Sequence, residues 1–205
     1  MVVVNLLETV IDLDAIATNT RILKNLVQPA QLMCVVKADG YNHGAIPVAR
    51  TVLANGADQL GVATLAEALE LREAGITAPI LCWIWSPEQD FAAALDANIH
   101  PAVVSMAHAQ AIVKYAAGKP EKLVQTTIKI DTGLHRSGVD ESQWEAVFTL
   151  LKDAGTATGN IEVTGVMSHL ACADEPGNPA NDTQAAAFNR AIALGRQLGL
   201  ELPVN

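Results

Sequence analysis

Short apolar runs alternate with longer helical patterns along almost the whole chain. Six runs have the β-branched or apolar character of buried strands, and they cover residues 31–36, 59–63, 79–83, 99–104, 124–130 and 161–167. Amphipathic helical patterns of roughly 12 to 20 residues separate these runs. A βαβα order of this kind predicts an α/β protein whose parallel sheet is covered by helices.

Capping signals delimit the predicted helices. Three expected starts carry a polar cap with a capping-box partner three residues later, and these pairs are Thr64 with Glu67, Ser86 with Gln89, and Asp140 with Gln143. Glycine readily takes the left-handed conformation that ends a helix. Glycines at expected ends are Gly56, Gly75, Gly155 and Gly199. The first helical pattern places Ile16, Leu23, Leu26 and Val27 on an apolar face that we expect to cover the sheet.

The same rhythm favours a TIM-like (β/α)8 barrel. No glycine-rich GxGxxG turn follows the first predicted strand, so a dinucleotide-binding open sheet is the less favoured alternative. A seventh strand is predicted to begin within residues 202–205, after a helix over 185–199. Because eight strands are needed to close such a barrel, we expect residues 1–205 to form a barrel truncated after about six to seven strands.

Composition excludes several functional classes. The 205 residues carry a net charge of −9 without a basic cluster, whereas a nucleic-acid binder needs the opposite sign. No apolar run approaches the roughly 20 residues of a membrane span, and the amino terminus lacks the cationic start of a secretory signal. The three cysteines are far apart and form no CxxC pair, which favours a reducing, cytoplasmic setting.

Lys37 is the first candidate site residue, because it ends a predicted buried strand. Active sites of parallel barrels lie at the carboxyl ends of their strands. Burial disfavours the ammonium form of a lysine and so favours a nucleophilic amine that can form a Schiff base. The alternative is a lysine that leaves the strand end for solvent. The flanking Gly40, Tyr41 and His43 weigh against that alternative.

Charged residues also end the fifth predicted strand. Strand alternation places Lys129 and Asp131 on one face. Arg136 follows in a glycine-flanked segment, and its guanidinium fork suits an anionic or phenolic oxygen. The alternative is a Lys129–Asp131 pair that only neutralises itself at the barrel mouth.

Aromatic and histidine side chains provide two further candidates. His169 ends the sixth predicted strand, where it is placed to stack on a flat cofactor or to hold a proton, although a purely structural histidine remains the alternative. Trp83 and Trp85, near the third strand, either wall a pocket or fill the core. We expect at least one of them to be a core residue.

Three ordered segments resemble signatures of the alanine racemase family. They are VVKADGYNHGA at 35–45, KIDTGLHRSG at 129–138 and GVMSHLACADE at 165–175. The segment VIDLDAIATNTRIL at 10–23 resembles the start of that family. The likeness runs essentially from end to end of the chain.

The resemblance implies a fold-type III enzyme that holds pyridoxal 5′-phosphate at the mouth of a TIM-like barrel and interconverts L- and D-alanine, with no metal. It implies that Lys37 forms the Schiff base with the cofactor and acts as one of two catalytic bases. Tyr41 matches a tyrosine that binds the cofactor phosphate, and Arg136 an arginine beside the phenolic oxygen and the substrate carboxylate. Lys129 matches a lysine that is carbamylated in many members and orients that arginine. His169 matches the histidine that lies against the pyridine ring.

Chains of this family are considerably longer than this one. The resemblance implies that the last barrel strands and a β-rich carboxyl-terminal domain lie beyond residue 205. It also implies a homodimer in which the second base is a tyrosine of the partner subunit, since Tyr41 has another role and Tyr115 matches no motif. We therefore expect residues 1–205 to be an incomplete amino-terminal barrel domain with little or no activity alone. The whole protein is expected to supply D-alanine for peptidoglycan.

Two other functions are the alternatives to alanine racemisation. A metal-dependent barrel hydrolase would use a carbamylated Lys129 with His135 and His169, but no HxH pair follows an early strand and Lys37 would have no role. A single-domain pyridoxal phosphate carrier without racemase activity would share the barrel, the lysine and this approximate length. Such carriers lack the sequences of the first two motifs, at 35–45 and 129–138.

Overall fold

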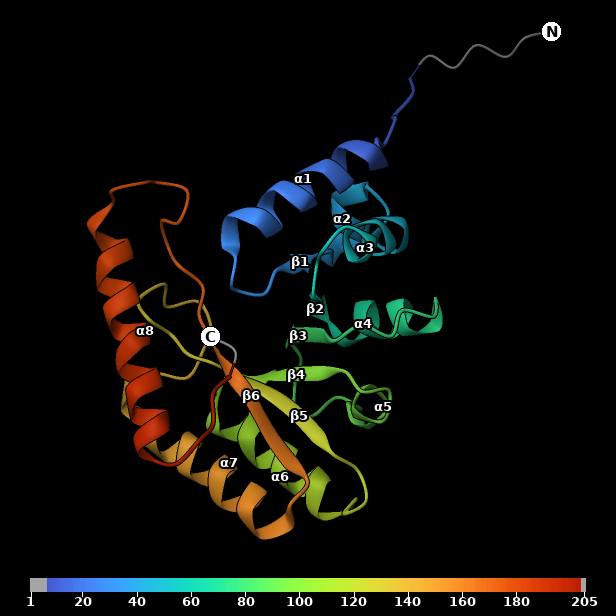
Figure 1. Ribbon diagram of the computed structural model, residues 1–205. Coiled ribbons are helices and arrows are strands. Elements are labelled where there is room, and N and C mark those ends of the chain that lie inside the picture. The colour runs from blue at the N-terminus through green and yellow to red at the C-terminus, as the bar shows by residue number, and fades with distance from the viewer. Residues whose placement is uncertain (1–6, 204–205) are drawn as a thin grey trace, which may run out of the picture.

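The computed structural model describes residues 7–203, whose strands form one parallel sheet (Figure 1). The strands are β1 (Met33–Val35), β2 (Gln59–Thr64), β3 (Ile80–Ile84), β4 (His100–Val103), β5 (Val124–Lys129) and β6 (Ile161–Met167). They follow one another in space in the order β1-β2-β3-β4-β5-β6, and every pairing is parallel. An open dinucleotide-binding sheet reverses its strand order at a switch point. The unreversed order confirms a partial TIM-like α/β barrel.

Helices alternate with the strands and lie along one face of the curved sheet (Figure 1). They are α1 (Leu13–Val27), α2 (Lys37–Asn42), α3 (Ala45–Ala54), α4 (Leu65–Glu73), α5 (Ala92–Asp96), α6 (Met106–Ala117), α7 (Trp144–Thr158) and α8 (Pro179–Gln197), with a 3₁₀ turn, η1, at Glu141–Gln143. Helix α8 begins earlier than the predicted 185–199. Asn178 caps it by accepting a hydrogen bond from the Ala180 N–H, and proline is favoured at the first helical position.

The hydrophobic core lies between the sheet and these helices. Alternate residues of each strand point toward the helices, and the fully buried members of this layer include Leu60, Val62, Ile80, Cys82 and Ile128 from strands and Leu71, Ile112 and Phe148 from helices. One face of the sheet is therefore dry and apolar. The other face borders the barrel interior and carries both polar and apolar side chains, including His100, Thr127, Leu81 and Val166.

The inner face of the sheet borders a cavity of about 630 Å³, which Met33, Gln59, His100, Thr127 and Thr164 help to line. Within residues 7–203 the edge strands β1 and β6 are not paired with each other. The predicted seventh strand at 202–205 falls partly outside the described residues, and 201–203 form neither strand nor helix. The barrel wall is thus open between β1 and β6 in the described part of the chain.

The predicted helix starts differ in outcome. Thr64 and Glu67 form a reciprocal capping box at the start of α4, as predicted. Asp140 accepts a hydrogen bond from the Ser142 N–H and begins η1, which leads directly into α7. The prediction at Ser86 is wrong. The backbone N–H of Ser86 donates to the Gln89 side chain within a closed turn, and α5 starts only at Ala92.

The predicted helix ends at Gly56, Gly75 and Gly199 are confirmed by positive φ angles of 108°, 82° and 87°. The prediction at Gly155 is wrong, because α7 continues to Thr158 and ends at Gly159. Glycine is needed at 155 for another reason. A Cβ there would lie 2.8 Å from the carbonyl oxygen of Ile161, so glycine lets α7 approach β6 closely.

The predicted apolar face of α1 is only partly correct: Ile16 packs against the core, but Leu23 and Leu26 do not cover the sheet. Leu26 is 74% exposed and Leu23 is 49% exposed, whereas Ala17 and Thr20 are buried. Helix α1 lies beside α3 rather than on the sheet (Figure 1). Among the described residues, no helix combines the length and the apolar character that a membrane crossing requires.

Candidate active site

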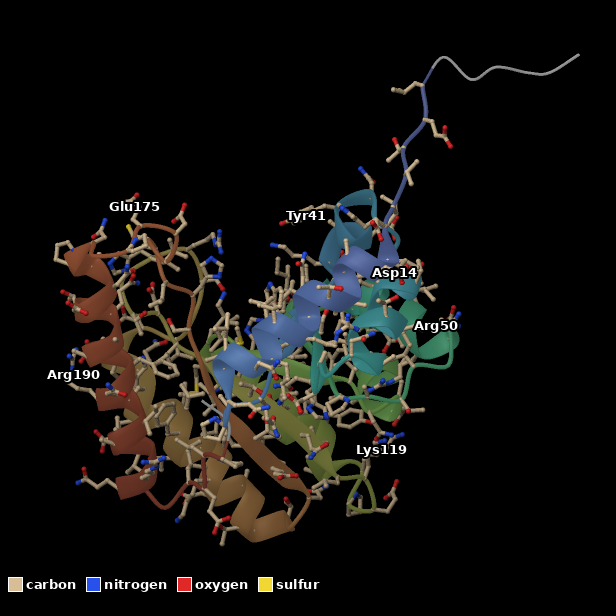
Figure 2. All side chains as sticks on the ribbon, turned by 45° about the horizontal axis from the view of Figure 1, so that its top comes forward. Asp14, Tyr41, Arg50, Lys119, Glu175 and Arg190 are labelled. Atoms are coloured by element: carbon tan, nitrogen blue, oxygen red, sulfur yellow. The ribbon has the colours of Figure 1, made fainter. Side chains whose placement is uncertain are left out.

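The candidate residues gather at the carboxyl ends of β1, β5 and β6. Figure 2 shows Tyr41, which follows β1, and Glu175, which follows β6, at the same end of the molecule, while Lys119, which precedes β5, lies toward the other end. Strands β1 and β6 are the two edges of the sheet. Curvature of the sheet therefore brings residues from its first and last strands to one mouth.

Lys37 lies two residues beyond the end of β1, which corrects its predicted place at the end of a buried strand. Strand β1 is an edge strand with only β2 beside it, and Val35 is 53% exposed. Lys37 itself is half-buried. Its ammonium nitrogen lies 5.9 Å from the centroid of the Tyr41 ring, which is 69% exposed at the mouth.

A left-handed helical turn follows Lys37. Ala38, Asp39, Gly40 and Tyr41 have φ angles of 53° to 59°, and Asn42 has 65°. Such a turn is unfavourable for L-residues other than glycine, by about 1–2 kcal/mol per residue. Contacts with the rest of the protein must therefore hold it.

Two carboxylates fasten the ends of this turn. The Ala38 N–H donates to Oε1 of Glu67 over 2.8 Å, and the Ala45 N–H donates to Oδ1 of Asp39 over 2.6 Å. Burial would raise the pKa of the Glu67 carboxyl, but hydrogen bonds from the N–H groups of Ala38, Thr64 and Ala63 outweigh burial and lower it. Glu67 is thus held as a carboxylate beside the turn.

The loop after β5 folds back on its own strand. The Val139 N–H donates to the Lys129 carbonyl, and the Asp131 N–H donates to the Val139 carbonyl. Oδ1 of Asp131 accepts hydrogen bonds from the N–H groups of Gly133 and His135, and Oδ2 lies 3.2 Å from Nδ1 of His135. This compact loop carries Arg136 into solvent at the mouth.

Lys129 is buried, with 4% of its surface exposed, and its Nζ donates to Oγ of Ser137 over 2.7 Å. Burial lowers the pKa of Lys129, the positive charge of Arg136 lowers it further, and the charge of Asp131 opposes both. The side chain of Lys129 is therefore directed to the loop of Arg136. The carboxylate of Asp131 is instead engaged with the backbone of that loop and with His135.

His169 lies near the positively charged residues of the site. Its pKa is lowered by partial burial and by the positive charges of Arg136, Lys129 and Lys37. Within residues 7–203, Lys37, Lys129 and Arg136 have no carboxylate within ion-pair distance. Three cationic side chains without an ion-paired carboxylate, in a chain of net charge −9, make this mouth a candidate site for an anionic ligand.

A network of buried hydrogen bonds joins the two loops of the site, and no sequence pattern predicted it. Gln184, on α8, is 3% exposed; its Oε1 accepts from the Ala171 N–H over 2.8 Å, and its Nε2 donates to Oγ1 of Thr132 over 3.4 Å. Thr132 and Ser168 share a hydrogen bond of 2.7 Å, and Ser168 also donates to the Ile130 carbonyl. Helix α8 thereby links the loops that carry Arg136 and His169.

Other candidates lie outside the mouth or have structural partners. Trp85 is a core residue, as expected for at least one tryptophan, and its indole N–H donates to the Ala102 carbonyl. Tyr115 donates to Asp96, near the amino end of β4 and far from the mouth; burial and that hydrogen bond raise the pKa of Tyr115. No group of three or more metal-ligating His, Cys, Asp or Glu side chains occurs among residues 7–203.

The fold and the site together define an α/β-barrel protein whose candidate site gathers cationic side chains at the carboxyl ends of its strands. A family profile described as alanine racemase, N-terminal domain, matches residues 11–205. The chain belongs to this family.

Known proteins extend the likeness. The chain is 62% identical to an alanine racemase of Corynebacterium efficiens and 46% identical to one of Thermobifida fusca, covering 98% and 94% of this chain but 53% and 51% of theirs. The crystal structure of alanine racemase from Corynebacterium glutamicum matches with a TM-score of 0.90 at 58% identity, over 98% of this chain and 56% of that one. Alanine racemase from Bacillus anthracis with bound L-Ala-P matches with a TM-score of 0.82 at 31% identity, over 94% and 49% of the two chains. The chain thus spans about half the length of the relatives it matches.

Proposed function

We propose that residues 1–205 form the amino-terminal barrel portion of a pyridoxal 5′-phosphate-dependent racemase that interconverts L- and D-alanine. The observation that carries this proposal is the gathering of Lys37, which lies 5.9 Å from the Tyr41 ring, with Lys129, Arg136 and His169 at the carboxyl ends of β1, β5 and β6. Pyridoxal phosphate has a phosphate and a phenolic oxygen, and alanine has a carboxylate. The donor set therefore fits both the cofactor and the substrate.

The cofactor, when bound, supplies the electron sink for the charge left by removal of the α-proton. In the proposed arrangement Lys37 would hold the cofactor covalently through Nζ, and its amine, once released from the cofactor, would act as a base for the α-proton on one face. Tyr41, whose hydroxyl is exposed at the mouth, binds the phosphate. His169 would hold the pyridine ring, and Arg136 would hold the phenolic oxygen and the substrate carboxylate.

Lys129 is proposed to orient Arg136. Its burial, its lowered pKa and its bond to Ser137 place an amine of reduced basicity in the arginine loop. A neutral amine is the form that carbon dioxide modifies, so these features support carbamylation of Lys129. The carbamate would be an anion beside Arg136, which fits the lack of another counterion there.

Further parts of the proposal rest on the family. We propose a homodimer whose partner subunit supplies the second base, a tyrosine outside residues 1–205, and hence little or no activity of residues 1–205 alone. The product would be D-alanine for peptidoglycan. The free state of Cys34, Cys82 and Cys172 supports a reducing, cytoplasmic setting.

The test is covalent trapping in the naturally produced protein. The protein is incubated with pyridoxal phosphate, reduced with borohydride, and analysed by intact mass and peptide mapping. We expect one pyridoxyl group on Lys37, none in Lys37→Arg, and normal labelling in Lys114→Arg, a control at an exposed lysine of α6.

The same sample is assayed for alanine racemisation. Labelling at Lys37 on an active chain longer than 205 residues supports the proposal. Labelling without racemase activity would favour a pyridoxal phosphate carrier. A folded, full-length chain that takes no label at Lys37 would remove the proposed mechanism.

A further inference from the structure

We propose that Glu67 is a positioning residue for Lys37. Glu67 lies in the first turn of α4, after β2, whereas Lys37 follows β1. Its carboxylate fixes the first peptide of the left-handed turn and thereby the direction in which the lysine enters the site. This inference rests on the proposed function and adds a residue whose sequence signal concerned only a helix cap.

The two oxygens of Glu67 have separate partners. Oε1 accepts from the Ala38 N–H over 2.8 Å, across from β1, while Oε2 accepts from the N–H groups of Ala63 and Thr64 over 2.8 and 2.9 Å, at its own helix start. All three partners are donors. A carboxylate satisfies both sides, whereas an amide would turn an NH2 donor toward one of them.

The hydrogen bond between Ala38 and Glu67 lies next to Lys37 in the chain, so it can influence the position of the lysine. Ala38 is the residue directly after Lys37 and the first left-handed residue of the turn, with φ 53° and ψ 47°. The backbone would leave this conformation without external partners, because alanine disfavours it. The Ala38 N–H belongs to the peptide that joins residues 37 and 38, so its hydrogen bond to Glu67 holds the backbone directly next to Lys37. A displacement of about 1 Å at a reacting group can cost about 100-fold in rate.

The capping function of Glu67 can be separated from the positioning function. Thr64 completes the capping box by accepting a hydrogen bond from the Glu67 N–H, and it has no hydrogen bond to the turn after β1. Thr64→Val therefore weakens the cap but leaves the hydrogen bond between Ala38 and Glu67 in place. Glu70→Gln, at an exposed residue of the same helix, makes the same charge change without either contact.

The experiment compares these variants in the full natural chain. We expect Glu67→Gln to lower kcat about 10-fold to 100-fold with little change in KM, and to slow pyridoxyl labelling of Lys37 by a similar factor. Thr64→Val and Glu70→Gln are expected to change both quantities less than twofold. Unfolding in urea is measured for every variant, so that a loss of stability is seen separately.

A second substitution keeps the test decisive if Glu67→Gln folds poorly. Aspartate is favoured in the first turn of a helix and keeps the negative charge there, but it is one methylene too short to span from α4 to Ala38. Glu67→Asp is therefore expected to fold and to show the loss of kcat and of labelling rate.

The outcomes separate the two proposals. If wild-type protein labels at Lys37 and Glu67→Asp labels at the wild-type rate, Glu67 is only a helix cap and the inference is wrong. The same conclusion follows if Thr64→Val slows labelling as much as Glu67→Gln. A wild-type chain that never labels at Lys37 would overturn the proposed function itself, and the positioning role with it.

Discussion

Gly138 lies where the loop of Arg136 returns to β5. Its φ is +130°, and a Cβ there would lie 2.6 Å from both the Asp131 nitrogen and the Ile130 carbonyl carbon. These are backbone atoms of the strand end, so neither can move without displacing the loop. The close return is what directs Ser137 toward Lys129.

We expect Gly138→Ala to lower the free energy of unfolding by about 3 kcal/mol, because the clash adds to the unfavourable φ. Urea unfolding measures this. Gly177→Ala is the matched control, since Gly177 has φ +85° but nothing within 4 Å of its Cβ position. It should cost only about 1 kcal/mol. An equal loss of unfolding free energy in the two variants would show that the loop at Gly138 shifts to accommodate the methyl group.

Sequence patterns identified the charged residues of the site but not their partners. Lys37, Lys129 and His169 stand at or just after strand ends, where a pattern of apolar runs makes them visible, and Arg136 lies in the loop after β5. The charges of Lys37, Lys129 and Arg136 all act on His169. Glu67 was visible only as a cap. Its partner Ala38 lies 29 residues away in the chain, so that contact exists only once β1 and β2 are paired.

Among the elements, α2 departs most from its sequence pattern. Asparagine, aspartate and glycine tolerate left-handed conformations, but Ala38 and Tyr41 do not favour them. From the apolar run before Lys37, the sequence predicted a strand that reaches the lysine, and it gave no signal for a left-handed turn. Anchors from Glu67 and from Asp39 decide the conformation instead.

Helix α8 offers a test of how an element supports the site. We expect Gln184→Leu to lower the free energy of unfolding by about 2 kcal/mol, because the Ala171 N–H and the Thr132 hydroxyl lose a buried partner. Hydrogen exchange at Ala171 should become faster. Gln197→Leu, at the exposed end of α8, is the control and should change neither quantity. Unaltered exchange at Ala171 in Gln184→Leu would argue against the link between α8 and the loop.

At the scale of the whole molecule, the barrel interior contains a partly buried histidine at the end where the strands begin. His100 lines the cavity; burial and the charge of Arg72 lower its pKa below 6.5, while Gln125 and Glu162 act in the opposite direction. The folded state thus binds this proton less tightly than the unfolded state. The penalty is absent well above pH 6.5 and grows as the pH falls through that value toward the lowered pKa.

The expected result is a free energy of unfolding that decreases below about pH 6.5, the usual range of histidine. His100→Gln should flatten this part of the profile, because the amide cannot take up a proton. Urea unfolding at several pH values between 5 and 8, roughly the range in which histidine titrates, measures both. A profile with the same slope in the variant would assign the pH dependence to other groups.

The sequence by itself determined the alternation of strands and helices, the parallel barrel class and the strand-end residues of the candidate site. These follow from local periodicity and from the chemistry of single side chains, which act over a few residues. Tertiary structure alone decided the left-handed turn after Lys37, the exposed face of α1, the continuation of α7 past Gly155 and the buried role of Gln184. Each of these depends on which distant backbone atoms come within hydrogen-bond or van der Waals distance, and no local pattern records that distance.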